Sequence, residues 1–68
     1  MTEHTKPLLT LFYAVLYNHH RNHFARFALS AADENSASQE AIAAAGPGYR
    51  LSTLTPLCRT TDMVHLEI

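Results

Sequence analysis

The sequence predicts a small α+β domain: an antiparallel sheet of three to four strands with one helix packed on one face, in the order β-β-α-β-β. Two segments, Phe24–Ser30 and Tyr49–Leu57, show the apolar and polar alternation of strands. An alanine-rich segment between them ends in Gly-Pro-Gly. Alanine side chains are too small to form a core without larger neighbours, so this helix is expected to lie on the sheet. The 68 residues make one domain, with residues 1–7 as a loose lead-in.

The first strand is expected over Leu8–Tyr17, the most apolar segment of the chain. Both faces of a strand would be filled there, and the aromatic and β-branched content favours a central strand buried on both sides. A helix that starts at Pro7 is the alternative, because a short apolar run fits either period. The polar segment Asn18–His23 predicts a hairpin turn into the second strand, Phe24–Ser30. One face of that strand should face the helix: Ala25, Phe27 and Leu29.

The helix is expected to follow a polar turn over residues 31–35. Ser36 with Gln39 fits a capping box, in which the serine hydroxyl accepts from a first-turn amide and the glutamine reaches back to the cap. The acidic pair Asp33 and Glu34 just before it suits the positive helix terminus. Gly46-Pro47-Gly48 is expected to end the helix. The apolar residues between form a narrow stripe: Ala37, Ala41, Ile42, Ala44 and Ala45.

Two further strands are expected after the helix. Tyr49–Leu57 has extended character, and Pro56 within it suits an edge strand or a strand end. Cys58–Asp62 is interpreted as a polar connection. Met63–Ile68 alternates and predicts a last strand. Its inward-facing residues should be Val64, Leu66 and Ile68.

Composition and charge argue against several classes of function. With 47% apolar and 16% charged residues, the chain is typical of a globular protein. Five basic residues against six acidic ones, with the basic residues scattered singly, disfavour nucleic-acid binding. The longest apolar run is too short to cross a membrane. The single cysteine, Cys58, and the absence of a secretory signal indicate a reducing cytoplasm.

Candidate chemical groups are few. His19, His20 and His23 have the density of a metal site, but no carboxylate or cysteine lies nearby, and a solvated turn explains them equally well. Cys58 with a histidine is an unconvincing nucleophile and base, because nothing in the spacing positions the pair. We therefore expect no enzyme activity, no cofactor and no metal.

A partner surface is the more promising feature. Tyrosine and arginine are enriched at protein-protein hot spots. A sheet with one layer of helix leaves its other face uncovered, and that face is expected to carry Phe12, Leu16 and Phe24. The candidate partner-binding residues are Phe12, Tyr13, Tyr17, Phe24, Arg26, Tyr49 and Arg50.

Four features follow one another along residues 11–55. They are an aromatic-rich strand at Leu11–Val15, a polar break with Arg21 and His23, the segment Ser30–Ala37 that leads into the helix, and a returning Gly48–Ser52. In this order they resemble small accessory proteins of bacteriophages and prophages. The nearest named group is the host cell division inhibitor-like (Icd-like) family of satellite prophages, and small β-α-β anti-CRISPR proteins are similar in plan. The resemblance implies a protein that binds and obstructs a host macromolecule without catalysis, and it carries over no site residue.

The expected function is therefore a small non-enzymatic module that binds a host or phage protein and inhibits or modulates it, with a homodimer through the uncovered face as a further option. Two alternatives stay open. One is a nucleic-acid-associated regulator that uses Arg26, Arg50 and Arg59. The other is a metal-binding protein that uses the histidine cluster.

Overall fold

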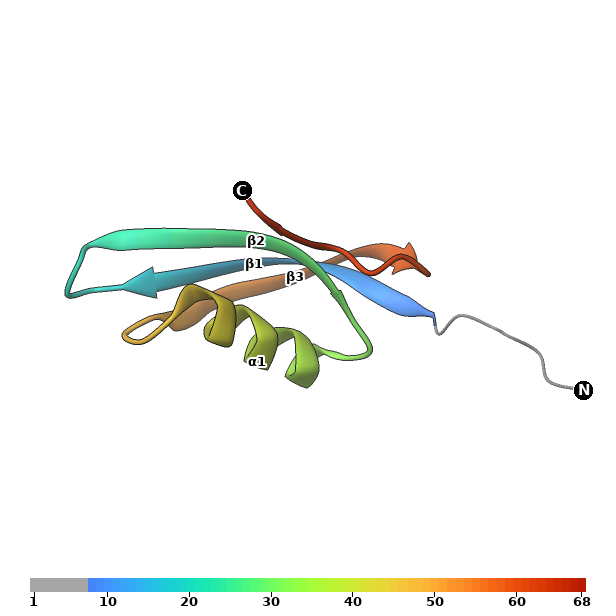
Figure 1. The fold of residues 1–68 in the computed structure, drawn as a ribbon, viewed down its shortest axis with the longest axis horizontal. Coiled ribbons are helices and arrows are strands. Elements are labelled where there is room, and N and C mark those ends of the chain that lie inside the picture. The colour runs from blue at the N-terminus through green and yellow to red at the C-terminus, as the bar shows by residue number, and fades with distance from the viewer. Residues whose placement is uncertain (1–7) are drawn as a thin grey trace, which may run out of the picture.

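The computed structural model describes residues 8–68, so the predicted loose lead-in lies outside the described part. The elements follow the predicted order β-β-α-β-β (Figure 1). They are β1 (Leu9–Asn18), β2 (His23–Ala31), α1 (Glu34–Ala45), β3 (Arg50–Thr60) and β4 (His65–Glu67). The α+β class with one helix and one antiparallel sheet is confirmed.

The sheet has the strand order β3-β1-β2-β4, and every neighbouring pair is antiparallel. β1 is therefore a central strand, and the helical alternative for this segment is excluded. The β1–β2 hairpin closes beyond the pair Asn18 and His23. The side-chain oxygen of Asn18 accepts from the backbone N–H groups of His20 (3.0 Å) and Arg21 (3.1 Å), which holds the turn. Asn22 adopts a positive φ of 53°, a conformation that asparagine tolerates.

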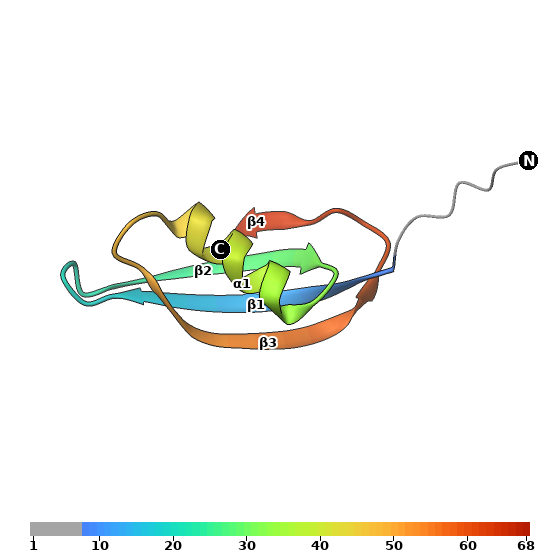
Figure 2. The same ribbon diagram turned by 90° about the horizontal axis from the view of Figure 1, so that it is seen from below.

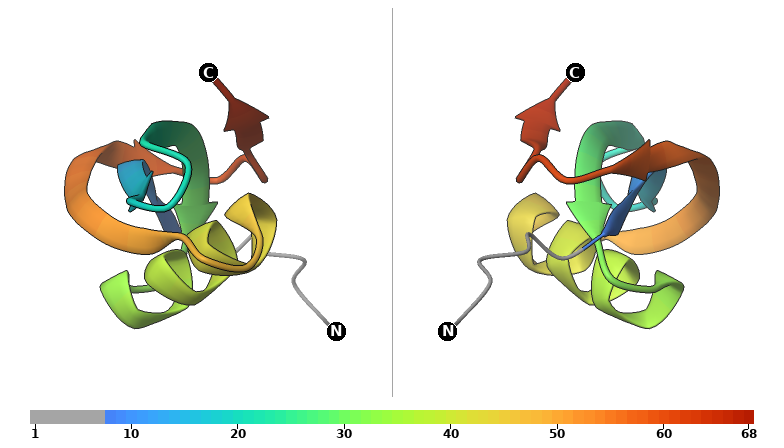
Figure 3. Two further views of the ribbon diagram at one scale, coloured as in Figure 1. Left: turned by 90° about the vertical axis from the view of Figure 1, so that its left-hand side faces the viewer. Right: turned by 90° about the vertical axis from the view of Figure 1, so that its right-hand side faces the viewer.

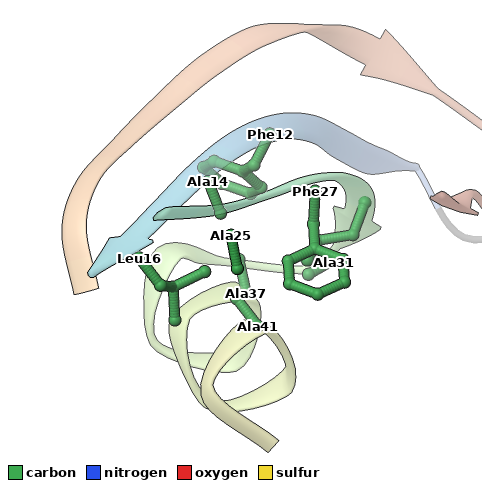
Figure 4. Packing of buried hydrophobic residues seen from close by; sticks show 9 residues of the cluster. Phe12, Ala14, Leu16, Ala25, Phe27, Ala31, Ala37 and Ala41 are labelled. Carbon is green, nitrogen blue, oxygen red and sulfur yellow. The ribbon is translucent and has the colours of Figure 1, made fainter. Parts of the chain in front are cut away.

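α1 lies across one face of the sheet and makes the core with it (Figure 2). Alternate residues of β1 and β2 point at the helix, where they meet Ala37 and Ala41 (Figure 4). The strand residues of this cluster are Phe12, Ala14, Leu16, Ala25, Phe27, Leu29 and Ala31. The face predicted for Ala25, Phe27 and Leu29 is confirmed.

The expectation that Phe12 and Leu16 share the uncovered face with Phe24 is wrong. Phe12 is 3% exposed and Leu16 is fully buried beneath the helix. Because the two faces of β1 are almost equally apolar, its alternation does not reveal which face the helix covers. The register settles it: Phe12 is opposite Leu29 and Leu16 is opposite Ala25, both of which face the helix.

The helix begins one turn before the predicted cap. Asp33 is the N-cap, and its carboxylate accepts from the backbone N–H of Ser36 at 2.8 Å. Ser36 is thus the third helical residue instead of the cap. The predicted end is confirmed, because Gly46 stops the helix with φ 102° and its N–H donates to the carbonyl of Ile42. Only Ala37 and Ala41 of the predicted stripe are fully buried.

β3 is longer than predicted. It continues through Pro56 to Thr60, so Cys58 and the next two residues belong to the strand instead of a polar connection. Two register shifts interrupt its pairing with β1, opposite Leu11/Phe12 and Val15/Leu16. β3 lies at the edge of the sheet, as Pro56 predicts.

β4 is short and is fastened to β2 through Ser30. The hydroxyl of this buried serine accepts from the Val64 N–H and donates to the carbonyl of Asp62, both at 2.8 Å. The prediction that Leu66 and Ile68 point inward is wrong, because they are 62% and 68% exposed. Leu66 pairs with Ala28, whose side chain points away from the helix.

Candidate functional site

The face of the sheet opposite α1 is the most distinctive surface of the molecule. Within residues 8–68 no helix packs against it, because α1 lies on the other side of the sheet (Figure 3), and the β3–β4 connection meets it at Ser30, whose hydroxyl bonds to Asp62 and Val64. The β1 residues on this face are all apolar or aromatic: Leu9 is buried (8% exposed), and Leu11, Tyr13, Val15 and Tyr17 are partly buried. An antiparallel sheet that faces water normally presents polar residues there. We call this surface the open face.

The strands on either side of β1 extend the open face unequally. On the β2 side, the register places Phe24 opposite Tyr17, Arg26 opposite Val15 and Ala28 opposite Tyr13. Leu66 of β4 continues the open face beyond β2. Ile68, which follows β4, continues it further, and its N–H donates to the Arg26 carbonyl. On the β3 side the register positions are polar except at Cys58: Arg50, Thr53, Thr55 and Cys58. The apolar part of the open face is therefore a stripe centred on β1, β2 and β4.

Aromatic rings and guanidinium groups gather at the hairpin end of the open face. The rings of Tyr17 and Phe24 lie 4.7 Å apart between centroids. The guanidinium carbon of Arg26 lies 5.9 Å from the centroid of the Phe24 ring, within the range of a cation–π contact. Arg50 is opposite Tyr17 on the β3 side. The Tyr17 hydroxyl donates to the side-chain oxygen of Asn22 at 2.8 Å, which fixes the ring.

The two edges of the sheet are poor places for another strand to add. On β3, Pro56 lacks an N–H group and the two register shifts disturb the strand, features that block edge-to-edge pairing. On the other side, β4 has only three residues. A partner is therefore offered a face instead of an edge.

The structure brings together five of the seven residues predicted for partner binding: Tyr13, Tyr17, Phe24, Arg26 and Arg50 lie on the open face. Phe12 does not contribute, because it is buried under the helix. Tyr49 packs against the core cluster, and its hydroxyl lies 2.9 Å from Nδ1 of His23. Sequence reasoning missed Leu66 and Ile68, although their alternation was visible, because alternation does not say which set points inward.

The three turn histidines are not gathered into one ligand set. The rings of His19 and His20 lie 4.2 Å apart, while His23 faces Tyr49. Within residues 8–68, no group of three or more His, Cys, Asp or Glu side chains is arranged to hold a metal ion.

The remaining candidates lie apart from one another. Cys58 is exposed on the open face opposite Leu11. Arg59 is opposite Thr10, so the register puts it on the other side of the sheet from Arg26 and Arg50. An open hollow of about 380 Å³ lies on the helix side of the sheet. It is lined by Glu34, Asn35, Ser38, Leu51 and Leu54.

Comparison of the chain with known protein families, with characterised proteins and with solved structures finds no match. In the part of the chain that the structure describes, no helix has the length and apolar character needed to cross a membrane.

Proposed function

We propose that this chain is a non-enzymatic protein-binding module that docks on another protein through its open face. The observation that carries the proposal is the central strand, in which Leu11, Tyr13, Val15 and Tyr17 all point away from the helix. Covering such a stripe removes apolar area from water, and each Å² contributes about 25 cal/mol. The buried core cluster lies on the helix side of the sheet and includes none of these four side chains.

The size of the open face suits a transient complex. Strands advance about 3.3 Å per residue and lie about 4.8 Å apart, so β1 with its neighbours makes a face of roughly 30 by 15 Å. Stable complexes bury about 800 Å² on each partner, and weaker signalling contacts bury less. The open face belongs to the second group. Exchange of the partner is therefore expected to be fast, and covalent capture is the appropriate assay.

The resemblance to phage and prophage accessory proteins adds a hypothesis about the partner. If the chain has that origin, the protein on the open face belongs to the host cell, and the bound module inhibits or modulates it by obstruction in the cytoplasm. Stoichiometric obstruction requires only a complementary surface.

Photo-crosslinking tests the proposal by position. The photoreactive amino acid p-benzoylphenylalanine replaces Phe24 or Leu66 on the open face, or Ile42 on α1, and cells that naturally contain the chain are irradiated. Ile42 is a matched control because it is 41% exposed, against 48% for Phe24 and 62% for Leu66. We expect a discrete protein adduct from the open-face positions and none from Ile42.

Two outcomes contradict the proposal. Equal adduct yields from all three positions would mean that crosslinking depends only on how exposed the position is to solvent. An adduct from Ile42 alone places the docking surface on the helix. Mass spectrometry of the adduct identifies the partner and shows whether it is a second copy of the chain.

A further inference from the structure

We propose that the partner presents carboxylate groups beside apolar side chains, so that the open face binds an acidic amphipathic surface such as one side of a helix. This inference rests on the proposed function and specifies the chemistry of the partner. It follows from the sign and the spacing of the charges on the open face.

The charged side chains at the register positions of the open face are two arginines. Arg26 and Arg50 occupy its register positions on either side of β1, and both are exposed. None of the acidic residues within residues 8–68 occupies a register position beside these arginines. Asp33, Glu34 and Glu40 belong to the helix and its cap, Asp62 lies in the β3–β4 connection, and Glu67 is opposite the helix-facing Phe27. A partner that covers the two arginines must therefore supply the counter-charge.

A second copy of the chain does not meet this requirement. A two-fold interface brings the same patch from both copies together. Two open faces packed together would bury four guanidinium groups, two from each copy. Within residues 8–68, no carboxylate side chain occupies a register position on either open face that could pair with them. Burying unpaired charge is strongly unfavourable.

A nucleic acid meets the requirement for charge but not the requirement for apolar contact. Much of the open face is aliphatic, with Leu11, Val15, Leu66 and Ile68 around the two arginines. Bases stack on aromatic rings and phosphates need several cations, so these aliphatic side chains would have no counterpart. Leucine or phenylalanine side chains of another protein would pack against these aliphatic side chains.

The spacing of the arginines suggests how the carboxylates are arranged. The Cα atoms of Arg26 and Arg50 are separated by two strand spacings across the sheet and about two residues along it, or roughly 12 Å. On an α-helix, residues seven or eight apart are separated by about 10 to 12 Å along the axis. Two glutamates about two turns apart, with leucines between them on the same side, fit this spacing.

The test uses two synthetic helical peptides of the same length. Both have leucines along one side, and the flanking positions, two turns apart, carry glutamate in one peptide and lysine in the other. Fluorescence anisotropy measures their dissociation constants with the whole chain. We expect the glutamate peptide to bind about tenfold more tightly or better, because like charges repel across an interface and opposite charges attract.

Substitutions in the chain test whether the preference for the glutamate peptide comes from Arg26 and Arg50. Arg26→Gln with Arg50→Gln should remove the preference, and Arg59→Gln, on the other side of the sheet, should leave it unchanged. Equal binding of the two peptides, or binding of neither, overturns the inference about charge. If photo-crosslinking at Phe24 still captures a protein, the proposed docking function survives that result. Capture of the chain itself, or tighter binding of oligo(dT) than of the glutamate peptide, also overturns the inference.

Discussion

Phe24 and Phe27 lie on the same strand and have opposite environments. Phe27 is 5% exposed in the core and stacks with His65 at 5.8 Å between ring centroids, whereas Phe24 is 48% exposed on the open face. The alternation of β2 predicts this difference, because polar and apolar residues separate its two faces. β1 lacks that contrast, which is why the prediction that Phe12 and Leu16 face away from the helix is wrong.

Replacing the two phenylalanines should therefore have unequal effects on stability. Phe27→Ala is expected to lower the free energy of unfolding by about 3–5 kcal/mol, because it leaves a cavity between the sheet and α1. Phe24→Ala should cost less than about 1 kcal/mol. Urea denaturation followed by circular dichroism measures both. Equal losses would mean that the open face supports the fold.

Gly48 is required by both its backbone and its surroundings. It has φ 88°, and a Cβ there would lie 2.8 Å from Nδ2 of Asn18, the residue that holds the hairpin turn. Gly48→Ala should cost about 1–2 kcal/mol for the left-handed backbone alone, and more for displacing Asn18. Gly46→Ala is not a matched control, because φ 102° with ψ −176° is a conformation nearly confined to glycine, although nothing lies within 4 Å of a Cβ there. If thermal denaturation shows that Gly48→Ala costs no more than the backbone change of about 1–2 kcal/mol, the contact with Asn18 is unimportant.

The first residue of the helix could not be predicted from the sequence alone. Asp33 and Ser36 are three residues apart, and either one could serve as the cap for a helix of nearly the same apolar pattern. The structure selects Asp33, whose carboxylate accepts from the Ser36 amide. The helix gains a turn, which lets its first residues border β3.

The cap makes helix stability depend on pH. The hydrogen bond from the Ser36 amide lowers the pKa of Asp33 below its usual 3.8, so the folded state favours the charged carboxylate. The charged carboxylate contributes its full stabilisation at a pH above the pKa that Asp33 has in the unfolded chain, and this stabilisation is lost as the pH falls through its pKa in the folded chain.

The variant Asp33→Asn keeps a capping side chain without the charge. The wild-type chain should melt at a higher temperature than this variant at about pH 6. The difference should disappear in strong acid. A constant difference at every pH would contradict the assignment.

The attachment of β4 depends on one hydroxyl. Ser30→Ala removes the hydrogen bonds to Val64 and Asp62 and should cost about 1–3 kcal/mol. Hydrogen exchange should show faster exchange at Val64 and Ile68, with β1 unchanged. Ser38→Ala removes a single exposed hydrogen bond to Asn35 and serves as the control. Unchanged protection of Ile68 would show that backbone pairing alone holds the segment.

The sequence predicts the layers of the fold better than it predicts the residues of the open face. The alanine-rich helix and the alternating strands lead to one sheet with one covered face, which the structure confirms. Which β1 residues remain outside depends on register and on the position of the helix, and β1 is apolar on both sides. The contribution of β4 depends on Ser30, a single hydrogen-bonding residue that no periodicity reveals.

The docking role of the open face is tested most directly by the yield of the crosslinked adduct in a variant with a less apolar open face. Phe24→Thr with Leu66→Thr changes two exposed residues of the stripe and keeps good strand formers. With p-benzoylphenylalanine at Tyr13, we expect the variant to melt at nearly the same temperature and to lose most of its partner adduct. An undiminished adduct from this folded variant would contradict the claim that the open face is the docking surface.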